Sequence, residues 1–143
     1  MATKNRQFVL ANHPEGLPSE STWRLVEAPM PEPKDGEILV RALWLSVDPY
    51  MRGRISPSKG YTKGVLPGEV MQGGGVGRVI ASRNPTFKSG DIVESMAFGW
   101  QEYPVLKTEG TRLIDPALGP IRHALGVLGM PGLTAYFALR EIG

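Results

Sequence analysis

The sequence predicts a mainly β domain that is rich in turns, and three observations support this prediction. The 143 residues include 18 glycines and 13 prolines without any repeat, and these residues separate short apolar runs of strand length. Three tryptophans, four tyrosines and four phenylalanines, among 41% hydrophobic residues, argue against disorder and for a packed core. A chain of this length buries roughly two thirds of its unfolded surface, so it can form a core without covalent cross-links.

The composition excludes several classes of function. The sequence has no cysteine, which excludes disulfides, thiolate zinc sites, iron–sulfur clusters and cysteine nucleophiles. The two histidines, His13 and His123, are far apart in the chain, so no histidine-rich metal site is expected. The net charge is +2, and there is no basic run, no apolar stretch of membrane-spanning length and no secretory signal. We therefore expect a soluble cytoplasmic protein that binds neither nucleic acid nor membranes.

The first part of the chain predicts two short strands and an extended segment. Apolar runs at 6–11 and 22–27 predict strands, and the glycine, proline and serine residues of 15–21 predict a loop between them. Residues 28–35 include three prolines, so this segment is expected to be extended but not to form a central strand. The dipeptide Asp35-Gly36 predicts a turn before the next strand.

The clearest strand of the sequence covers 37–47. Both of its faces are mostly apolar, which predicts that the strand is covered on both sides. We expect it to end at Asp48-Pro49, where Pro49 opens a short helical turn with Asp48 as its N-cap, and we expect Gly53 to end that turn. A polar loop is expected over 55–63.

A cluster of glycines, at positions 73, 74, 75 and 77, interrupts the strand pattern of 69–82. Glycines inside a strand indicate a bulge, a sharp bend or the close approach of another group to the backbone. The dinucleotide-binding fingerprint Gly-x-Gly-x-x-Gly is not met, because Arg78 stands at its last glycine position and the strand pattern continues beyond it. We therefore interpret these glycines as bends of a β structure and not as a phosphate-binding loop.

The next segments predict further strands and then helices. A hairpin is expected between 91–97 and 100–106 with its turn at Phe98-Gly99, and a short strand is expected over 111–114. Helical spacing begins at Ile121, where the alternation of the strands ends.

A second helix is expected over 131–141, with Gly143 as its C-cap. This helix is apolar on nearly every side, which predicts that another surface buries it. Nothing in the sequence follows it, so we expect the chain to be the N-terminal part of a larger protein. We also expect that the chain by itself either self-associates, as a homodimer or otherwise, or has a disordered last helix. The expected organisation is a β domain over 1–120 and a helical junction over 121–143.

No residue is identified as catalytic by its chemistry alone. The carboxylates lack an acid–base partner at a recognisable spacing, and no nucleophilic serine elbow or P-loop is present. The segment 46–52 places an aromatic residue, a methionine and an arginine in a turn directly after the most buried strand. Such a turn can grip a flat ligand, or its tyrosine and methionine can simply fill the core. The residues leave both interpretations open.

Five motifs together resemble the N-terminal portion of the zinc-free medium-chain dehydrogenase/reductases, in the branch of prostaglandin reductases, plant alkenal double-bond reductases and bacterial curcumin reductases. They cover almost the whole chain and are LSVDPYMRGR (45–54), VMQGGGVGRVIAS (70–82), SGDIV (89–93), GWQEY (99–103) and LGVLGMPGLTAYFAL (125–139). The resemblance implies a partly open, GroES-like β-barrel as the substrate-side domain. It also implies short C-terminal helices that lead toward a Rossmann domain outside this chain.

The resemblance further implies an activity and a set of site residues. Family members reduce the carbon–carbon double bond of α,β-unsaturated ketones and aldehydes by hydride transfer from NADPH. Pro49 and Tyr50 match residues beside the nicotinamide and the substrate, and Tyr50 is the expected catalytic residue. Met130, Gly132 and Thr134 match a segment that borders the nicotinamide. The expected partner is a small enone, and this chain alone is expected to be inactive.

No metal is expected, because zinc-dependent relatives have a cysteine where this chain has Asp48-Pro49. Two alternatives to the enone reductase stay open. One is a non-enzymatic GroES-like barrel that acts as a binding or adaptor module. The other is a zinc-free quinone reductase of a related branch.

Overall fold

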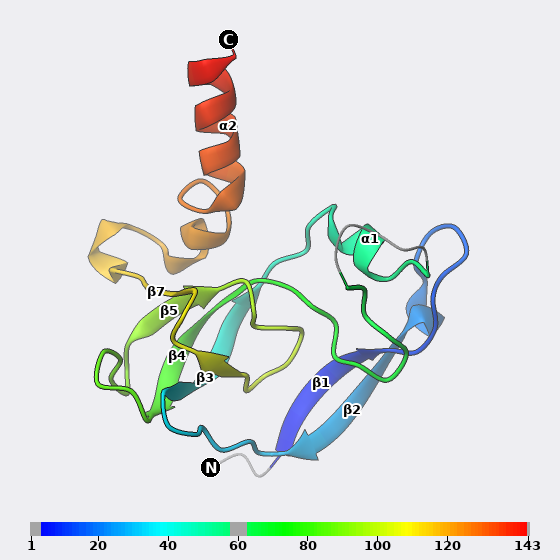
Figure 1. Cartoon of the computed structure of the whole chain (residues 1–143), viewed down its shortest axis with the longest axis horizontal. Helices are drawn as coiled ribbons and strands as arrows, with labels where there is room; N and C mark the ends of the chain where they lie inside the picture. The colour runs from blue at the N-terminus through cyan, green and yellow to red at the C-terminus, as the bar shows by residue number, and fades with distance from the viewer. Residues whose placement is uncertain (1–3, 58–62, 143) are drawn as a thin grey trace.

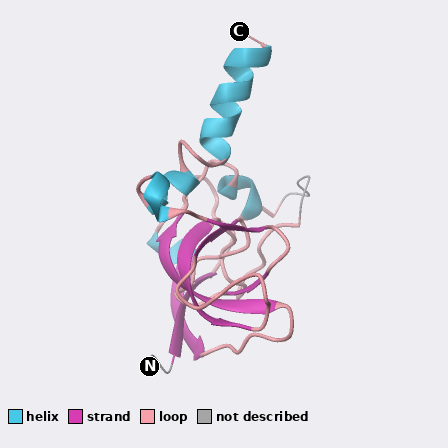
Figure 2. Cartoon of the chain, turned by 90° about the vertical axis from the view of Figure 1, so that its left-hand side faces the viewer, coloured by secondary structure: helices cyan, strands magenta, loops and turns pink. Residues whose placement is uncertain are grey.

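The computed structural model describes residues 4–57 and 63–142 and shows a curled, partly open β-barrel with a single long helix at its end (Figure 1). The prediction of a mainly β fold with C-terminal helices is therefore confirmed. In both views the helices lie at one end of the β structure, and the N-terminus lies at the other (Figures 1 and 2). None of the helices in the described part of the chain is long and apolar enough to cross a membrane.

The larger of the two sheets has five antiparallel strands in the order β6-β3-β4-β5-β7. Its strands are β3 (Glu37–Leu45), β4 (Gly75–Ser82), β5 (Ile92–Ser95), β6 (Val105–Lys107) and β7 (Thr111–Leu113).

The smaller sheet consists of β1 (Lys4–Leu10) and β2 (Trp23–Pro29), which pair antiparallel. Backbone hydrogen bonds join it to the larger sheet through the segment 100–104. The Phe8 amide donates to the Trp100 carbonyl at 2.8 Å, and the Ala42 amide donates to the Glu102 carbonyl at 2.8 Å. These bonds curl the two sheets into one barrel wall.

The prediction of a hairpin between 91–97 and 100–106 is wrong. Strand β5 pairs with β4 and β7, whereas β6 pairs with β3. The reason lies in the segment between the two strands. Phe98 is buried in the core, Gly99 has a φ of +65°, and the Trp100 amide donates to the Met71 carbonyl at 2.8 Å. The chain therefore crosses toward β1 instead of turning back on β5.

The expectation that both faces of the third strand are covered holds only for its first half. Ile38, Leu39 and Val40 are buried, but the side chains from Leu43 to Leu45 are more than a third exposed. Leu43, Trp44 and Leu45 instead line an open cavity that Phe8 and Leu25 of the small sheet also border.

The interpretation of the glycine cluster as bends of a β structure is confirmed. A Cβ atom on Gly75 would lie 2.5 Å from the Phe98 ring, and one on Gly77 would lie 2.4 Å from the Arg41 carbonyl oxygen. Opposite these glycines, the register of β3 against β4 shifts between Ala42 and Trp44. Glycine is thus required where the wall bends and other groups approach the backbone.

Helices occupy the connections and the end of the chain. They are the 3-10 turns η1 (Glu20–Thr22), η2 (Pro116–Leu118) and η3 (Ile121–Leu125), and the α-helices α1 (Met51–Arg54) and α2 (Met130–Glu141).

No surface among the described residues buries α2, so the expectation that another surface covers this helix stays a prediction. The helix projects away from the barrel (Figure 1), and none of its residues is buried. Leu133, Tyr136 and Phe137 are each more than half exposed. The predicted C-cap, Gly143, lies outside the described residues, and Ile142 caps the helix.

Candidate functional site

The turn after β3 is built around the buried side chain of Met51. The Met51 amide donates to the Asp48 carbonyl at 3.1 Å, and the Asp48 amide donates in return to the Met51 sulfur at 3.3 Å. The prediction of Asp48 as N-cap is wrong, since Tyr50 stands at that position with helical backbone angles and no side-chain cap. Gly53 lies within α1 and does not end it, because the helix runs on to Arg54.

Tyr50 is half-buried, and Pro49 before it is exposed. The Tyr50 ring packs on one apolar cluster of the core, together with Trp23 and Trp100. The buried members of that cluster are Leu10, Met51, Ile55, Val65 and Met71. Burial, aided by the negative charge of Asp48, raises the pKa of the Tyr50 phenol above 10, although Arg54 acts in the opposite direction. The phenol is therefore a neutral hydrogen-bond donor at physiological pH.

The residues predicted at the start of the last helix line a different part of the molecule. Met130 and Thr134 face a cavity of about 480 Å³, which they share with Met96 and Phe137. The remaining lining residues are Glu94, Arg112, Gly129 and Leu133. The Thr134 hydroxyl donates to the Met130 carbonyl at 2.8 Å, so its oxygen remains free to accept a hydrogen bond.

Gly132 fills a structural role in the first turn of α2. Its amide donates to the Gly126 carbonyl at 3.1 Å, and a Cβ atom at this position would lie 1.8 Å from the Val127 carbonyl oxygen. No larger residue fits without moving the backbone. Gly132 thus allows the start of the helix to lie close against the preceding turn.

A short path of contacts connects the Tyr50 turn to this cavity. The Ser46 amide donates to the Gly74 carbonyl at 2.9 Å, and the Gly74 amide donates to the Ser46 hydroxyl at 3.1 Å. A Cβ atom on Gly74 would lie 3.1 Å from the sulfur of Met96, which lines the cavity beside Met130. The two groups of predicted residues therefore lie at the same end of the barrel, but Tyr50 does not line the cavity of Met130 and Thr134.

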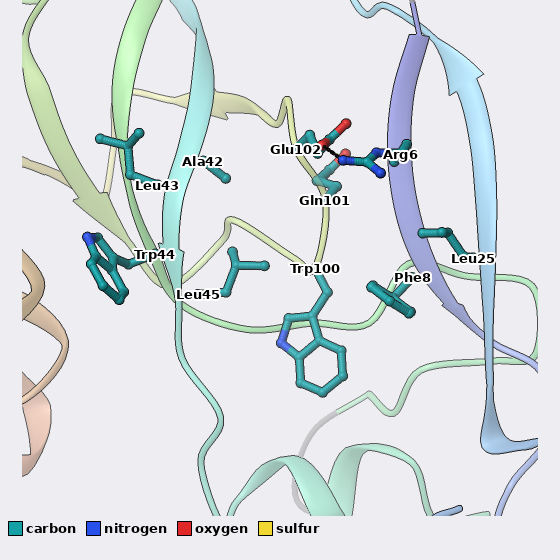
Figure 3. A pocket seen from close by; sticks show the side chains of 10 residues that line it. All are labelled: Arg6, Phe8, Leu25, Ala42, Leu43, Trp44, Leu45, Trp100, Gln101 and Glu102. Carbon is teal, nitrogen blue, oxygen red and sulfur yellow. Dashed lines mark hydrogen bonds and ion pairs between the residues drawn. The ribbon is translucent and has the colours of Figure 1, made fainter. Parts of the chain in front are cut away.

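A second apolar cavity, of about 350 Å³, lies on the side of Trp100 that faces away from the Tyr50 cluster (Figure 3). Phe8 and Leu25 line it from the small sheet, and the later residues of β3 line it from the large sheet. At one end Arg6 donates a hydrogen bond to Glu102, and this bond lowers the pKa of the Glu102 carboxyl. The Trp100 ring thus separates this cavity from the cluster that holds Tyr50.

Sequence reasoning missed several residues of this region. Met96 follows a short strand and carries no pattern of its own, so only the fold places it beside Met130. Ser46 and Trp100 stand inside quoted motifs, but their pairing depends on a crossing of the chain that the sequence did not predict. Among the described residues, no group of three His, Asp or Glu side chains is arranged to hold a metal ion.

Comparison with known proteins defines the class. Residues 6–114 match the family model described as the N-terminal domain of oxidoreductase, and the chain belongs to this family. The chain is 44% identical over 141 residues to the NADPH-dependent curcumin reductase of Escherichia coli. The matched region covers 98% of this chain and 40% of that protein. It is 39% identical over 140 residues to prostaglandin reductase 1 of Rattus norvegicus, and this match covers 96% of this chain and 40% of the rat protein.

The solved structures agree with these sequence relatives. CurA from Vibrio vulnificus superimposes with a TM-score of 0.89 at 43% identity, covering 97% of this chain and 41% of CurA. The complex of CurA with NADPH superimposes with a TM-score of 0.87 at 43% identity, covering 96% and 41%. The resemblance that the motifs indicated is therefore confirmed. The chain spans about two fifths of the length of the relatives it matches.

Proposed function

We propose that this chain is the substrate-side domain of an NADPH-dependent reductase that acts on the carbon–carbon double bond of α,β-unsaturated ketones and aldehydes. The observation that supports this most strongly is the match of nearly the whole chain to CurA in its complex with NADPH, at 43% identity. The names of the sequence relatives point in the same direction, since they include a 2-alkenal reductase (NADP⁺-dependent) of Nicotiana tabacum, 36% identical over 145 residues.

The cavity at the base of α2 fits one edge of a nicotinamide ring. Its walls are the apolar side chains of Met96, Met130, Leu133 and Phe137, which suit a flat uncharged ring. The Thr134 oxygen offers one hydrogen-bond acceptor at the rim. Bound NADPH supplies the hydride for the reaction. The residues of this chain would border that ring, and the rest of the cofactor would be held by a part of the polypeptide that follows.

Tyr50 and Pro49 would border the substrate from the other side of the Ser46–Gly74 junction. The Tyr50 phenol is neutral, so it can donate a hydrogen bond to an uncharged oxygen. Its ring is held by the apolar cluster beneath it and by the guanidinium of Arg54, whose carbon lies 5.8 Å from the ring centroid. A ring held in this way presents a fixed surface to a flat enone.

The test compares two substrate classes and two lengths of polypeptide. A polypeptide of the relatives' length should oxidise NADPH with an alkenal and release the saturated aldehyde, whereas the 143-residue chain alone should not. Faster turnover of a quinone would instead favour the quinone reductase. Absence of NADPH oxidation with both substrates would favour a binding or adaptor module. We expect no requirement for a metal, so a chelator should leave the rate unchanged.

A further inference from the structure

The path of the chain into α2 is short and tightly packed. Turn η3 packs on the large sheet through buried Ala124, beside Val76 and Ile92. The chain then turns within a few residues, as the Leu128 amide donates to the His123 carbonyl at 2.9 Å. A Cβ atom on Gly129 would lie 2.0 Å from the Ala124 carbonyl oxygen, so this turn accepts only glycine there.

Arg112 of β7 reaches this turn from the sheet. Its Nη2 donates to the Leu128 carbonyl at 3.3 Å, one residue before the cap of α2. Its Nε lies 3.3 Å from the Glu94 Oε2. Glu94 stands directly opposite Arg112 in the antiparallel pair of β5 and β7. The guanidinium therefore bonds one carboxylate through Nε and one backbone carbonyl through Nη2, and a lysine, which has a single nitrogen, cannot place donors at both positions.

The burial of the two partners shows which of them orients the other. The Glu94 side chain is only 16% exposed, whereas the Arg112 side chain is 53% exposed. The carboxylate is thus held in the sheet, and the arginine extends from it toward the turn. The residues of α2 are not buried, so the helix receives little guidance from packing against the barrel.

We propose that Arg112 is a positioning residue: oriented by Glu94, it fixes the Leu128 carbonyl and thereby the first turn of α2, with Met130 and Thr134, relative to the barrel. Both Arg112 and Glu94 also line the cavity that Met130 and Thr134 share. The catalytic consequence rests on the proposed function, since it requires that this cavity borders the cofactor. The link between the sheet and the helix does not depend on that function.

The test uses Arg112→Lys, which keeps the charge beside Glu94 but loses the second donor nitrogen, and Glu94→Gln, which keeps an acceptor oxygen but removes the negative charge that holds the arginine. The matched control is Arg83→Lys, because Arg83 forms an exposed ion pair with Asp35 at 3.6 Å, away from α2. Hydrogen exchange is measured at the amides of 128–130, 132 and 133, since Pro131 has no amide hydrogen. Kinetics with NADPH and an alkenal are measured on a polypeptide of the relatives' length.

Arg112→Lys should speed hydrogen exchange at these amides of 128–133 by about tenfold and leave the exchange rates in the strands of the barrel unchanged. It should lower kcat by about tenfold and change the KM for NADPH less than about twofold. Glu94→Gln should give smaller changes of the same kind, and Arg83→Lys should give neither. Unchanged exchange at 128–133 would overturn the proposal, and a raised KM for NADPH with unchanged exchange would show that Arg112 contacts the cofactor instead. If a polypeptide of the relatives' length reduces no enone, the proposed function fails, while the exchange result still decides whether Arg112 links the sheet to the helix.

Discussion

The indole nitrogen of Trp100 donates a hydrogen bond to the carbonyl oxygen of Ser46 at 3.2 Å, across 54 positions of the chain. The same ring packs on Trp23, with ring centroids 5.0 Å apart. One side chain therefore ties the end of β3 to the small sheet. Because Ser46 directly precedes the segment 47–50, this bond also fixes where the Tyr50 turn begins.

Replacing Trp100 with phenylalanine tests that bond. Phenylalanine keeps most of the packing but lacks the N–H donor, so the Ser46 carbonyl loses a partly buried partner. We expect the free energy of unfolding to fall by about 1–2 kcal/mol in urea titration. Trp44→Phe is the control, since Trp44 is about half exposed and should change stability little. Equal effects of the two substitutions would contradict the role of the Ser46 bond.

Gly77 should tolerate no side chain. A Cβ atom there would lie 2.4 Å from the Arg41 carbonyl oxygen and 2.6 Å from the Val40 side chain. Gly77→Ala should lower the free energy of unfolding by about 2–3 kcal/mol, because the backbones of β3 and β4 must move apart. Gly53→Ala, in the open space of α1, should instead be neutral or stabilise by up to about 1 kcal/mol. A mild effect at Gly77 would show that the sheet bends there for another reason.

Tyr50 should matter more for turnover than for folding. In a polypeptide of the relatives' length, Tyr50→Ala should lower kcat/KM for an alkenal by at least about tenfold, because it removes the ring that the proposed function places beside the substrate. Tyr50→Phe keeps the ring and should retain more activity than Tyr50→Ala. Thermal unfolding of each variant separates lost activity from lost structure. Activity that survives Tyr50→Ala would show that the turn serves only the fold.

The ionisation of Tyr50 should weaken the fold at high pH. Its phenol has a pKa raised above 10 by burial and by Asp48. The stabilisation from the neutral phenol is complete below the unfolded value of about 10, and it is lost as the pH rises from there through the folded pKa. Absorbance at 295 nm reports the ionisation of tyrosines. The ionisation step above pH 10 that belongs to Tyr50 should therefore be missing in Tyr50→Phe. Arg54→Gln should raise this pKa further, since Arg54 lowers it. A phenol of Tyr50 that ionises below pH 10 would contradict the burial of its ring.

The 143-residue chain should self-associate through α2. Leu133, Phe137 and Leu139 are each more than half exposed on this helix, and exposed apolar surface of this kind favours association. Sedimentation should show a mass that rises with concentration. Leu133→Glu combined with Phe137→Glu should return the chain to a monomer, whereas Leu17→Glu, on an exposed loop, should not. A wild-type chain that stays monomeric throughout would refute this prediction.

The sequence predicted local features that depend on neighbouring residues. The strands at 6–11 and 111–114 and the last helix were placed within a few residues of their observed bounds. The glycines of 73–77 were correctly interpreted as bends, because a strand gains no packing from a position without a side chain unless the backbone bends or a neighbour approaches it there.

The sequence could not predict which strands pair. Phe98-Gly99 has the composition of a hairpin turn, but the burial of Phe98 and the bond from the Trp100 amide to Met71 send the chain elsewhere. The link between Arg112 and Leu128 escaped prediction for the same reason. Both contacts join positions that only the tertiary fold brings together, and no local periodicity records them. Whether Pro49, Tyr50, Met130, Gly132 and Thr134 act on a cofactor stays a prediction.

Any tilt of α2 relative to the barrel would pivot at the tight turn before the helix. The helix has 12 residues, which makes it a stiff rod of about 18 Å. A tilt of about 10° at Gly129 would carry its far end about 3 Å sideways, while the barrel residues around Tyr50 would not move. The length of the helix would therefore turn a small change at the Arg112–Leu128 bond into a larger movement of any structure attached beyond Glu141.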